Sequence, residues 1–198
     1  MINTVELDLP EVNVREVERY LGIKRSSNEV NELISRASEL IAPHIKTAAV
    51  YRLFDISIDG DECDLGFARV HSSSLSKNLQ GCSEIIVVCA TAGLEIDRLI
   101  KRYEVTSPAL SHAISALGSE RIEALMDSFC QFAREKYGKV RPRFSAGYGD
   151  FDLAYQRDIF TALTPHRTLG IALTDSLLMS PSKSVSAIIG ICRENNEE

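Results

Sequence analysis

The sequence predicts an α+β fold: one domain in which a mainly antiparallel, twisted sheet is packed by helices. Helical and strand-like periodicities are mixed along the chain, without the regular β-α-β alternation of a parallel nucleotide-binding sheet. A hairpin signal joins two of the expected strands. With 198 residues, 44% hydrophobic and 25% charged, the chain has the size and composition of a single globular domain. We therefore expect one domain over residues 1–198.

The first part of the chain, residues 1–90, is typical of scaffold. Residues 4–9 alternate between apolar and polar side chains, which favours a strand. A short helix is expected at 13–21, and Ser27 or Asn28 can cap a longer helix that ends near Ile45. These elements carry no chemical motif.

The middle of the chain alternates strand and helix signals. Residues 48–58 are rich in β-branched and aromatic side chains, and the turn Asp59-Gly60-Asp61 leads to a second short strand at 63–67. A short helix is expected at 73–79, an apolar strand at 84–90 and a helix at 93–103. We expect this region to supply the hairpin and an apolar strand that is joined closely to the helix after it.

The strongest helical signal covers residues 107–137. Ser107 is the cap, Pro108 occupies the first helical position, and Gly138 ends the helix. Gly118 either divides this segment into two helices or permits close packing of a neighbour, and the pattern leaves both open.

The C-terminal part combines an irregular loop with short elements. Prolines and glycines at 141–150 exclude a regular helix. A helix is expected at 152–163, strands at 169–173 and 185–192 flank a polar insert at 174–184, and a frayed tail is expected at 193–198.

Composition excludes several classes of function. The net charge is −6 and the basic residues are dispersed, so nucleic acid is not an expected partner. No apolar run reaches the roughly 20 residues that cross a bilayer, and no signal peptide is visible, so we expect a cytoplasmic protein without a membrane partner. The 5 cysteines and 4 histidines share no metal-ligand or catalytic spacing, which predicts free thiols and no metal site.

Two segments can carry a ligand. In Arg143-x-x-x-Gly147-Tyr148, a guanidinium suits a carboxylate, glycine allows close backbone approach, and tyrosine offers a flat face. The segment from Leu173 to Ser186 concentrates hydroxyl groups, one acid and one base around Met179. From the residues alone, an ordinary structural loop and an ordinary surface turn explain the two segments as well.

In order and separation, the two segments resemble the activation domain of vitamin B12-dependent methionine synthase. The resemblance is specific over residues 143–190, where Gly170-Ile171-x-Leu173-Thr174-x-Ser176-x-x-Met179-x-Pro181-x-x-Ser184-Val185-Ser186 follows the first motif. It is looser over residues 90–138, and the part from 91 to 192 therefore carries the recognised motifs.

The resemblance implies a domain that binds S-adenosylmethionine and donates its methyl group when the cobalt of a partner corrinoid has been oxidised to cob(II)alamin. By carry-over, Arg143 holds the ligand's carboxylate, Glu123 meets its amino group, and Ala146, Gly147 and Tyr148 contact or shape the site of the adenosine. The expected cleft lining is Thr174, Ser176, Met179, Lys183 and Ser184. No acid, base or nucleophile of the protein is required, so no catalytic residue is expected.

The chain also departs from the family. It is shorter, a tyrosine expected beyond Ser184-Val185-Ser186 has no counterpart, and neither a corrinoid-binding motif nor a methyl-acceptor zinc site is present. We therefore expect not a complete enzyme but a stand-alone accessory subunit of cobalamin-dependent methionine synthase, a methyltransferase of methionine biosynthesis. Its partners would be the cobalamin-binding subunit, which alone brings cobalamin, and a flavodoxin-like or other electron donor. The alternatives are a docking module without ligand binding and a reactivation partner of another corrinoid methyl-transfer protein.

Overall fold

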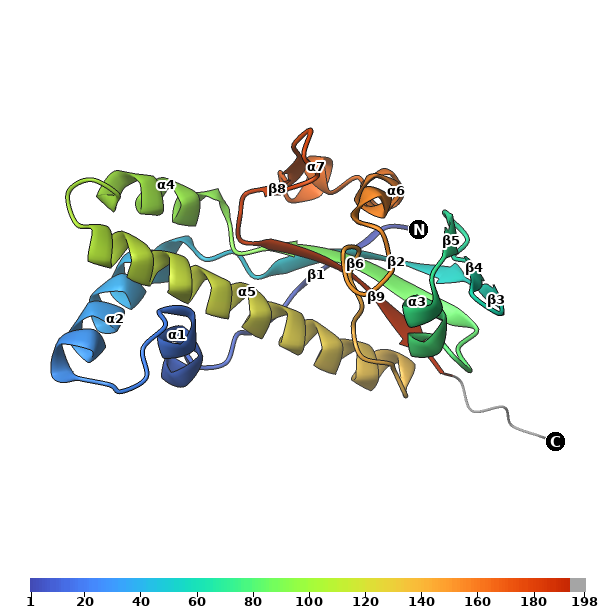
Figure 1. Cartoon of the computed structure of the whole chain (residues 1–198), viewed down its shortest axis with the longest axis horizontal. Helices are drawn as coiled ribbons and strands as arrows, with labels where there is room; N and C mark the ends of the chain where they lie inside the picture. Colours follow the sequence, from blue (N-terminus) through green and yellow to red (C-terminus); the bar gives the residue numbers. More distant parts are fainter. Residues whose placement is uncertain (193–198) are drawn as a thin grey trace.

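A four-stranded antiparallel sheet with helices on both faces forms the centre of the computed structural model, which describes residues 1–192 (Figure 1). The strand order is β1-β2-β6-β9, and every neighbouring pair is antiparallel. The strands are β1 Asn3–Glu6, β2 Ala48–Asp55, β6 Glu84–Thr91 and β9 Ser184–Ile191. This arrangement confirms the predicted α+β fold.

One face of the sheet is covered by four helices. They are α1 Val14–Tyr20, α2 Asn28–Ile41, α4 Leu94–Tyr103 and α5 Pro108–Tyr137. Alternate strand residues such as Val88 and Ile189 point to this side and share a core cluster with Leu117 and Phe129 of α5. The expected cap Ser27 accepts a hydrogen bond from the N–H of Val30 at 3.3 Å, which confirms the start of α2.

The opposite face carries a second core cluster. Ile85, Val87 and Ile188 point to this side. They are covered by α3 Ser73–Asn78, the 3-10 turn η2 Leu153–Tyr155, α6 Gln156–Leu163 and a three-stranded sheet of β3 Ser57–Asp59, β4 Glu62–Asp64 and β5 Arg69–His71. The two clusters place the central sheet between two apolar layers.

Helix α5 is continuous, so Gly118 does not divide it. A Cβ at this position would lie 2.9 Å from Cγ2 of Ile96 and 3.1 Å from Cγ of Lys183. The glycine therefore allows α4 and the segment before β9 to approach α5 closely, which is the second of the two predicted alternatives.

A buried ion pair fixes the N-terminal segment to α5. The side chains of Glu120 and Arg121 are each 5% exposed, and Nε of Arg121 lies 2.5 Å from Oε2 of Glu120. The guanidinium also donates to the carbonyls of Pro10 at 2.8 Å and Glu11 at 3.2 Å. Oε1 of Glu120 accepts the N–H of Asn13 at 3.0 Å, so the pair holds residues 10–13 against the helix.

The structure corrects the predicted elements in four places. The strand expected at 48–58 is broken at Ile56, because β2 pairs with β6 only as far as Asp55, opposite the first residue of β6. Strand β5 was not predicted. The strand expected at 169–173 is reduced to β7 Ala172–Leu173, which follows the short helix α7 Pro165–Thr168 and pairs with β8 Met179–Ser180. The helix expected to 45 ends in the 3-10 turn η1 Ala42–His44.

The remaining predicted elements are present within a few residues of their expected bounds. The frayed tail predicted at 193–198 lies outside the described residues.

Candidate ligand-binding site

The site lies at the start of β9, an edge strand of the central sheet, where no strand pairs with its outer edge in the described part of the chain. Further along this edge strand, Phe144 and Ile188 exchange both backbone hydrogen bonds, at 2.8 and 2.7 Å. Beyond Phe144 the backbone pairing stops, and the hydroxyl of Ser145 donates to the carbonyl of Ser186 at 2.7 Å. Because alternate residues of a strand face the same edge, the N–H of Ser186 points to the uncovered part, as that of Ile188 points to Phe144.

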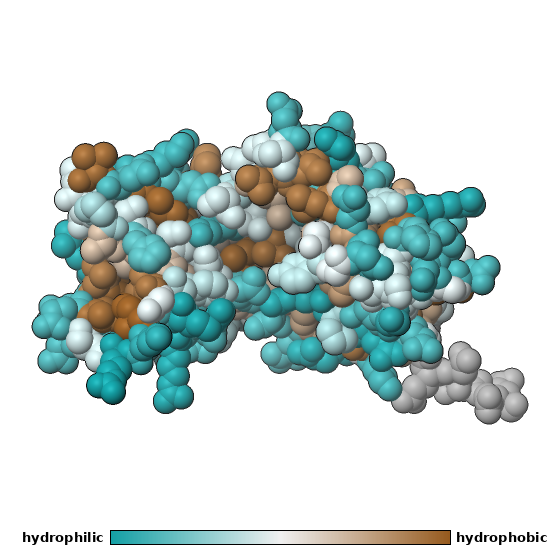
Figure 2. Space-filling model, in the orientation of Figure 1, coloured by the Kyte–Doolittle hydropathy of each residue, from teal (hydrophilic) through white to brown (hydrophobic). Residues whose placement is uncertain are grey.

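A cavity of about 370 Å³ occupies this uncovered end. Its volume is within the range of small-molecule sites. In Figure 2 the surface is hollowed near the middle of the face, over the start of β9, with apolar surface beside the hollow. The cavity, here called the β9-edge pocket, is lined by Glu123, Arg143, Phe144, Ser145, Ala146, Tyr148, Gln156, Met179, Ser184, Val185 and Ser186.

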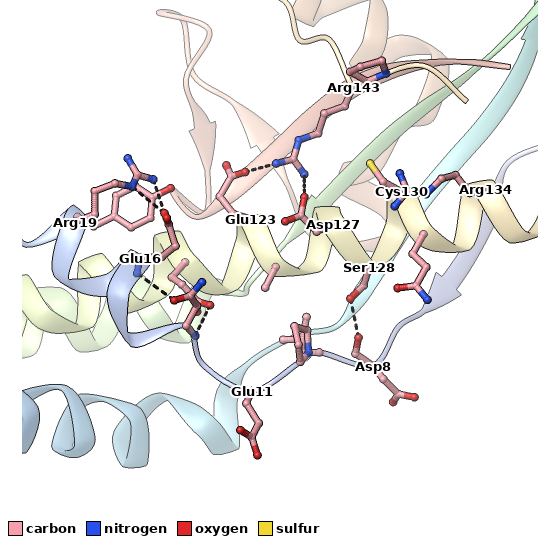
Figure 3. Close-up of a pocket in the computed structure, with 18 residues that line it drawn as sticks. Asp8, Glu11, Glu16, Arg19, Glu123, Asp127, Ser128, Cys130, Arg134 and Arg143 are labelled. Carbon is pink, nitrogen blue, oxygen red and sulfur yellow. Dashed lines mark hydrogen bonds and ion pairs between the residues drawn. The ribbon is translucent and has the colours of Figure 1, made fainter. Parts of the chain in front are cut away.

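One end of the β9-edge pocket is charged. Glu123 and Asp127 are four residues apart on α5, so both carboxylates are on one side of the helix. Nη2 of Arg143 lies 2.5 Å from Oε2 of Glu123, and Nη1 lies 3.0 Å from Oδ1 of Asp127. Figure 3 shows the guanidinium reaching from the loop to both carboxylates. These ion pairs use two of its five N–H groups, and the side chain stays 28% exposed.

The other end is polar and uncharged. Gln156 opens helix α6 and is 4% exposed, and its Oε1 accepts the hydroxyl of Ser186 at 2.7 Å. Ser184, 8% exposed, hydrogen-bonds to the carbonyl of Pro181 at 2.7 Å and the hydroxyl of Thr91 at 2.9 Å. Since α5 and α6 cover opposite faces of the sheet, the pocket extends from one face to the other around the edge of β9.

The loop between Arg143 and α6 is held by a compact turn. Gly147 has φ +94°, a conformation that side chains other than glycine rarely adopt. Its N–H donates to the carbonyl of Phe151 at 2.7 Å, and the N–H of Phe151 donates to the carbonyl of Tyr148 at 3.0 Å. Phe151 is 1% exposed and stacks on Tyr155 with 5.4 Å between ring centroids. The turn therefore rests on the second core cluster.

Asp150 ties the same loop to α3. Its carboxylate accepts the hydroxyl of Ser72 at 2.6 Å and the N–H groups of Ser73 and Ser74 at 2.9 and 3.0 Å. These hydrogen bonds hold the pKa of Asp150 well below its usual range, and the bond from Ser72 has the largest effect. The anchor is thus an ionised carboxylate at the start of a helix.

The structure brings together six of the residues predicted for the site. Glu123, Arg143, Ala146, Tyr148, Met179 and Ser184 all line the β9-edge pocket. Tyr148 is 68% exposed, which places it at the rim.

Four predicted residues do not line this pocket. Gly147 is exposed beside the pocket, and Cδ1 of Leu153 would lie 3.3 Å from a Cβ at that position. Thr174 and Ser176 are exposed and bond to each other, 3.0 Å between hydroxyls, in the turn between β7 and β8. Lys183 donates instead to the hydroxyls of two serines of α5, and burial lowers its pKa.

Phe144, Ser145 and Val185 line the pocket from within the two predicted segments, although they were not singled out, and three more residues of the site were missed by the sequence analysis. Asp127 was detectable, because it repeats the carboxylate of Glu123 one helical turn later. Gln156 and Ser186 meet across thirty positions of sequence through a side-chain hydrogen bond, and no local pattern indicates such a contact.

A larger cleft of about 1100 Å³ adjoins the charged end. It runs between α5 and the segment from Asp8 to Tyr20, and it shares Glu123 and Arg143 with the β9-edge pocket. Figure 3 shows that Arg19 and Glu16 of α1 face α5 across it. Arg143 therefore stands at the junction of the two openings.

Two classes of site find no support in the described part of the chain. Residues 1–192 contain no group of three or more acidic, cysteine or histidine side chains arranged to hold a metal ion. Among the helices formed by the same residues, none is both long and apolar enough to span a membrane.

Comparison with known proteins agrees with the resemblance seen in the sequence. Residues 118–196 match the family model of the vitamin B12 dependent methionine synthase activation domain. The solved structure "Crystal Structure of the MetH Reactivation Domain bound to AdoHcy" matches in fold with a TM-score of 0.75 and 16% sequence identity, covering 100% of this chain and 80% of that one. At this identity the likeness establishes the fold alone. No curated protein matches the chain.

Proposed function

We propose that this protein binds S-adenosylmethionine in the β9-edge pocket. It resembles the activation domain of vitamin B12-dependent methionine synthase in sequence over residues 118–196 and in fold over its length. The solved neighbour carries AdoHcy, which differs from S-adenosylmethionine by the methyl group. The proposal is supported by two observations together: the ligand of that neighbour, and a pocket in this chain whose lining suits such a ligand.

The observation that carries the proposal is the contact between Arg143 and Glu123, a cation and an anion 2.5 Å apart on the pocket wall. A free amino acid presents a carboxylate and an ammonium group on one carbon atom. The guanidinium matches the carboxylate through two parallel hydrogen bonds, and the glutamate matches the ammonium. Asp127 shares the guanidinium and keeps it oriented while the pocket is open.

The remaining lining suits the nucleoside. Phe144, Tyr148 and Met179 supply apolar and aromatic surface, and Ala146 leaves room for a ring beside the backbone. The hydroxyl groups of Ser184 and Ser186 and the N–H of Ser186 supply polar partners. A zwitterion at one end and a heterocycle at the other describe an S-adenosyl amino acid.

In this proposal the protein presents the ligand's sulfonium methyl group to a cobalamin-carrying partner, a methionine synthase subunit, for reductive reactivation. The sulfonium is already a reactive methyl donor, so the work of this chain is to hold and orient it. Arg143 and Glu123 fix the amino-acid end, and the exposed rim with Tyr148 leaves the pocket open to a docked partner. The electron would come from a flavodoxin-like or other donor protein.

Titration calorimetry with S-adenosylhomocysteine, the unreactive analogue, tests ligand binding. Arg143→Met removes a charge-assisted contact of about 1.5–3 kcal/mol, so we expect a roughly 10- to 100-fold weaker affinity than in the native protein. The matched control is Arg134→Met. Arg134 lines the larger cleft beside α5 but not the β9-edge pocket, so its replacement should change affinity less than about twofold.

Two outcomes would contradict the proposal: no binding heat from the folded native protein at millimolar ligand, or equal losses from both arginine variants. The first would favour a docking module without ligand binding. The role in reactivation is tested separately, by mixing the protein with a cob(II)alamin-loaded corrinoid protein, a reductant and methyl-labelled ligand. Label should reach the cobalamin of methionine synthase, and label on another corrinoid protein alone would reassign the partner.

A further inference from the structure

The side-chain amide of Gln156 has a hydrogen-bond donor without a partner in the described part of the chain. The side chain is 4% exposed and lines the β9-edge pocket. Its Oε1 is taken by the hydroxyl of Ser186 at 2.7 Å. Among the described residues, Nε2 has no hydrogen-bond partner. Nε2 is not among the fully buried polar atoms that lack a partner, so this atom remains accessible although the residue as a whole is buried. An accessible donor on the wall of a pocket can bond to a ligand that fills it.

The position of Gln156 determines which part of a ligand it meets. It opens α6, on the face of the sheet opposite α5, whereas Arg143 and Glu123 meet on the α5 side. If the amino-acid end is bound there, as in the proposed function, the rest of the ligand is directed around the edge of β9 toward α6. Phe144, Tyr148 and Met179 line the same pocket and suit a flat ring.

We propose that Gln156 is a specificity-determining residue, whose Nε2 donates a hydrogen bond to a ring nitrogen of the ligand's adenine. This inference rests on the proposed function. With Oε1 fixed by Ser186, Nε2 is the atom that remains for the ligand, and a donor requires an acceptor opposite it. The unsubstituted ring nitrogens of adenine are acceptors, whereas its exocyclic amino group is a donor.

The test compares S-adenosylhomocysteine with analogues in which one ring nitrogen is replaced by CH, the 1-deaza, 3-deaza and 7-deaza forms. In the native protein one analogue should bind about 5- to 30-fold more weakly, because it takes away the acceptor opposite the side-chain amide. In Gln156→Met, of similar length but without the donor, the same analogue and the parent ligand should bind equally well.

Gln131→Met is the matched control. It makes the same substitution at an exposed glutamine outside the β9-edge pocket, where the side chain donates to Glu135 at 2.9 Å, so the preference for the parent ligand should remain. Thermal unfolding of each variant confirms that it is folded before titration.

Three results would overturn the inference. They are equal binding of all deaza analogues to the native protein, a deaza loss that persists unchanged in Gln156→Met, and, in a further titration with the analogue whose exocyclic amino group is replaced by hydrogen, a loss of affinity confined to that analogue. The last would mean that Gln156 accepts rather than donates. Failure of the native protein to bind S-adenosylhomocysteine would instead refute the proposed function, so the two failures are distinguishable.

Discussion

Replacing Arg121 by methionine tests how the N-terminal segment is attached to α5. The substitution keeps an unbranched, apolar side chain of similar length and removes the guanidinium. Glu120, 5% exposed at its side chain, would then keep its charge with only the N–H of Asn13 as a partner at 3.0 Å. The carbonyls of Pro10 and Glu11 would lose their donor as well.

The expected loss is large. Removing one partner of a buried ion pair costs about 3–5 kcal/mol, because the remaining charge is buried without compensation. A domain is stable by only about 5–15 kcal/mol in total. With a urea dependence of roughly 2 kcal/mol per molar, a loss of about 4 kcal/mol lowers the unfolding midpoint by about 2 M.

Urea unfolding followed by circular dichroism measures this difference. Arg98→Met is the matched control, because Arg98 pairs with Glu95 on the surface with a side chain 63% exposed, and it should cost less than about 1 kcal/mol. In the double variant Glu120→Leu with Arg121→Met the uncompensated carboxylate is gone, so part of the stability should return. A loss for Arg121→Met as small as that of Arg98→Met would refute the reasoning.

The remaining predictions concern the loop and the helix packing. Asp150→Asn should destabilise the protein at pH 7 and less so at pH 3, as measured by urea midpoints. The pKa of Asp150 is lower in the folded state than in the unfolded state, so the stability that the carboxylate contributes is present above the unfolded pKa and is lost as pH falls through the folded pKa. Equal differences at both pH values would contradict this. Gly118→Ala should lower stability by about 1–3 kcal/mol through its clash with Ile96, despite the better helix propensity of alanine, and Ile96→Leu in the same chain should restore part of the loss. Phe151→Ala should lower the free energy of unfolding by about 3–5 kcal/mol and weaken ligand binding, since the ring supports the loop of the site. A destabilised variant that binds with native affinity would show that the ring serves stability and not the binding site.

The long helix and the central strands were predictable because their signals are local. Ser107, Pro108 and Gly138 mark the ends of α5 in the sequence itself, and the structure confirms both. The role of Gly118 was not decidable, because Ile96 and Lys183, which contact it, come from distant parts of the chain. Strand β5 has only three residues, too few for a periodic signal.

The candidate site was predictable in part. Arg143, Glu123 and Tyr148 came from a resemblance between motifs, and the structure places all three on one pocket. Lys183 was expected in the same cleft because it stands in the second motif, yet its side chain crosses to α5. Strand alternation directs the side chains of Ser184 and Ser186 toward the α6 side of the sheet. Lys183 precedes the strand, so the direction of its side chain depends on tertiary packing.

The most direct test of the central claim is a nuclear magnetic resonance titration of the ¹⁵N-labelled protein with S-adenosylhomocysteine. The account predicts that amide signals from residues 143–148 and 184–186, the side-chain amide of Gln156 and the guanidinium of Arg143 shift together and saturate. Signals from the hairpin at 57–64, on the far side of the second core cluster, should stay unchanged. Saturating shifts at another surface, or none at millimolar ligand, would contradict the assignment of the β9-edge pocket as the S-adenosyl site.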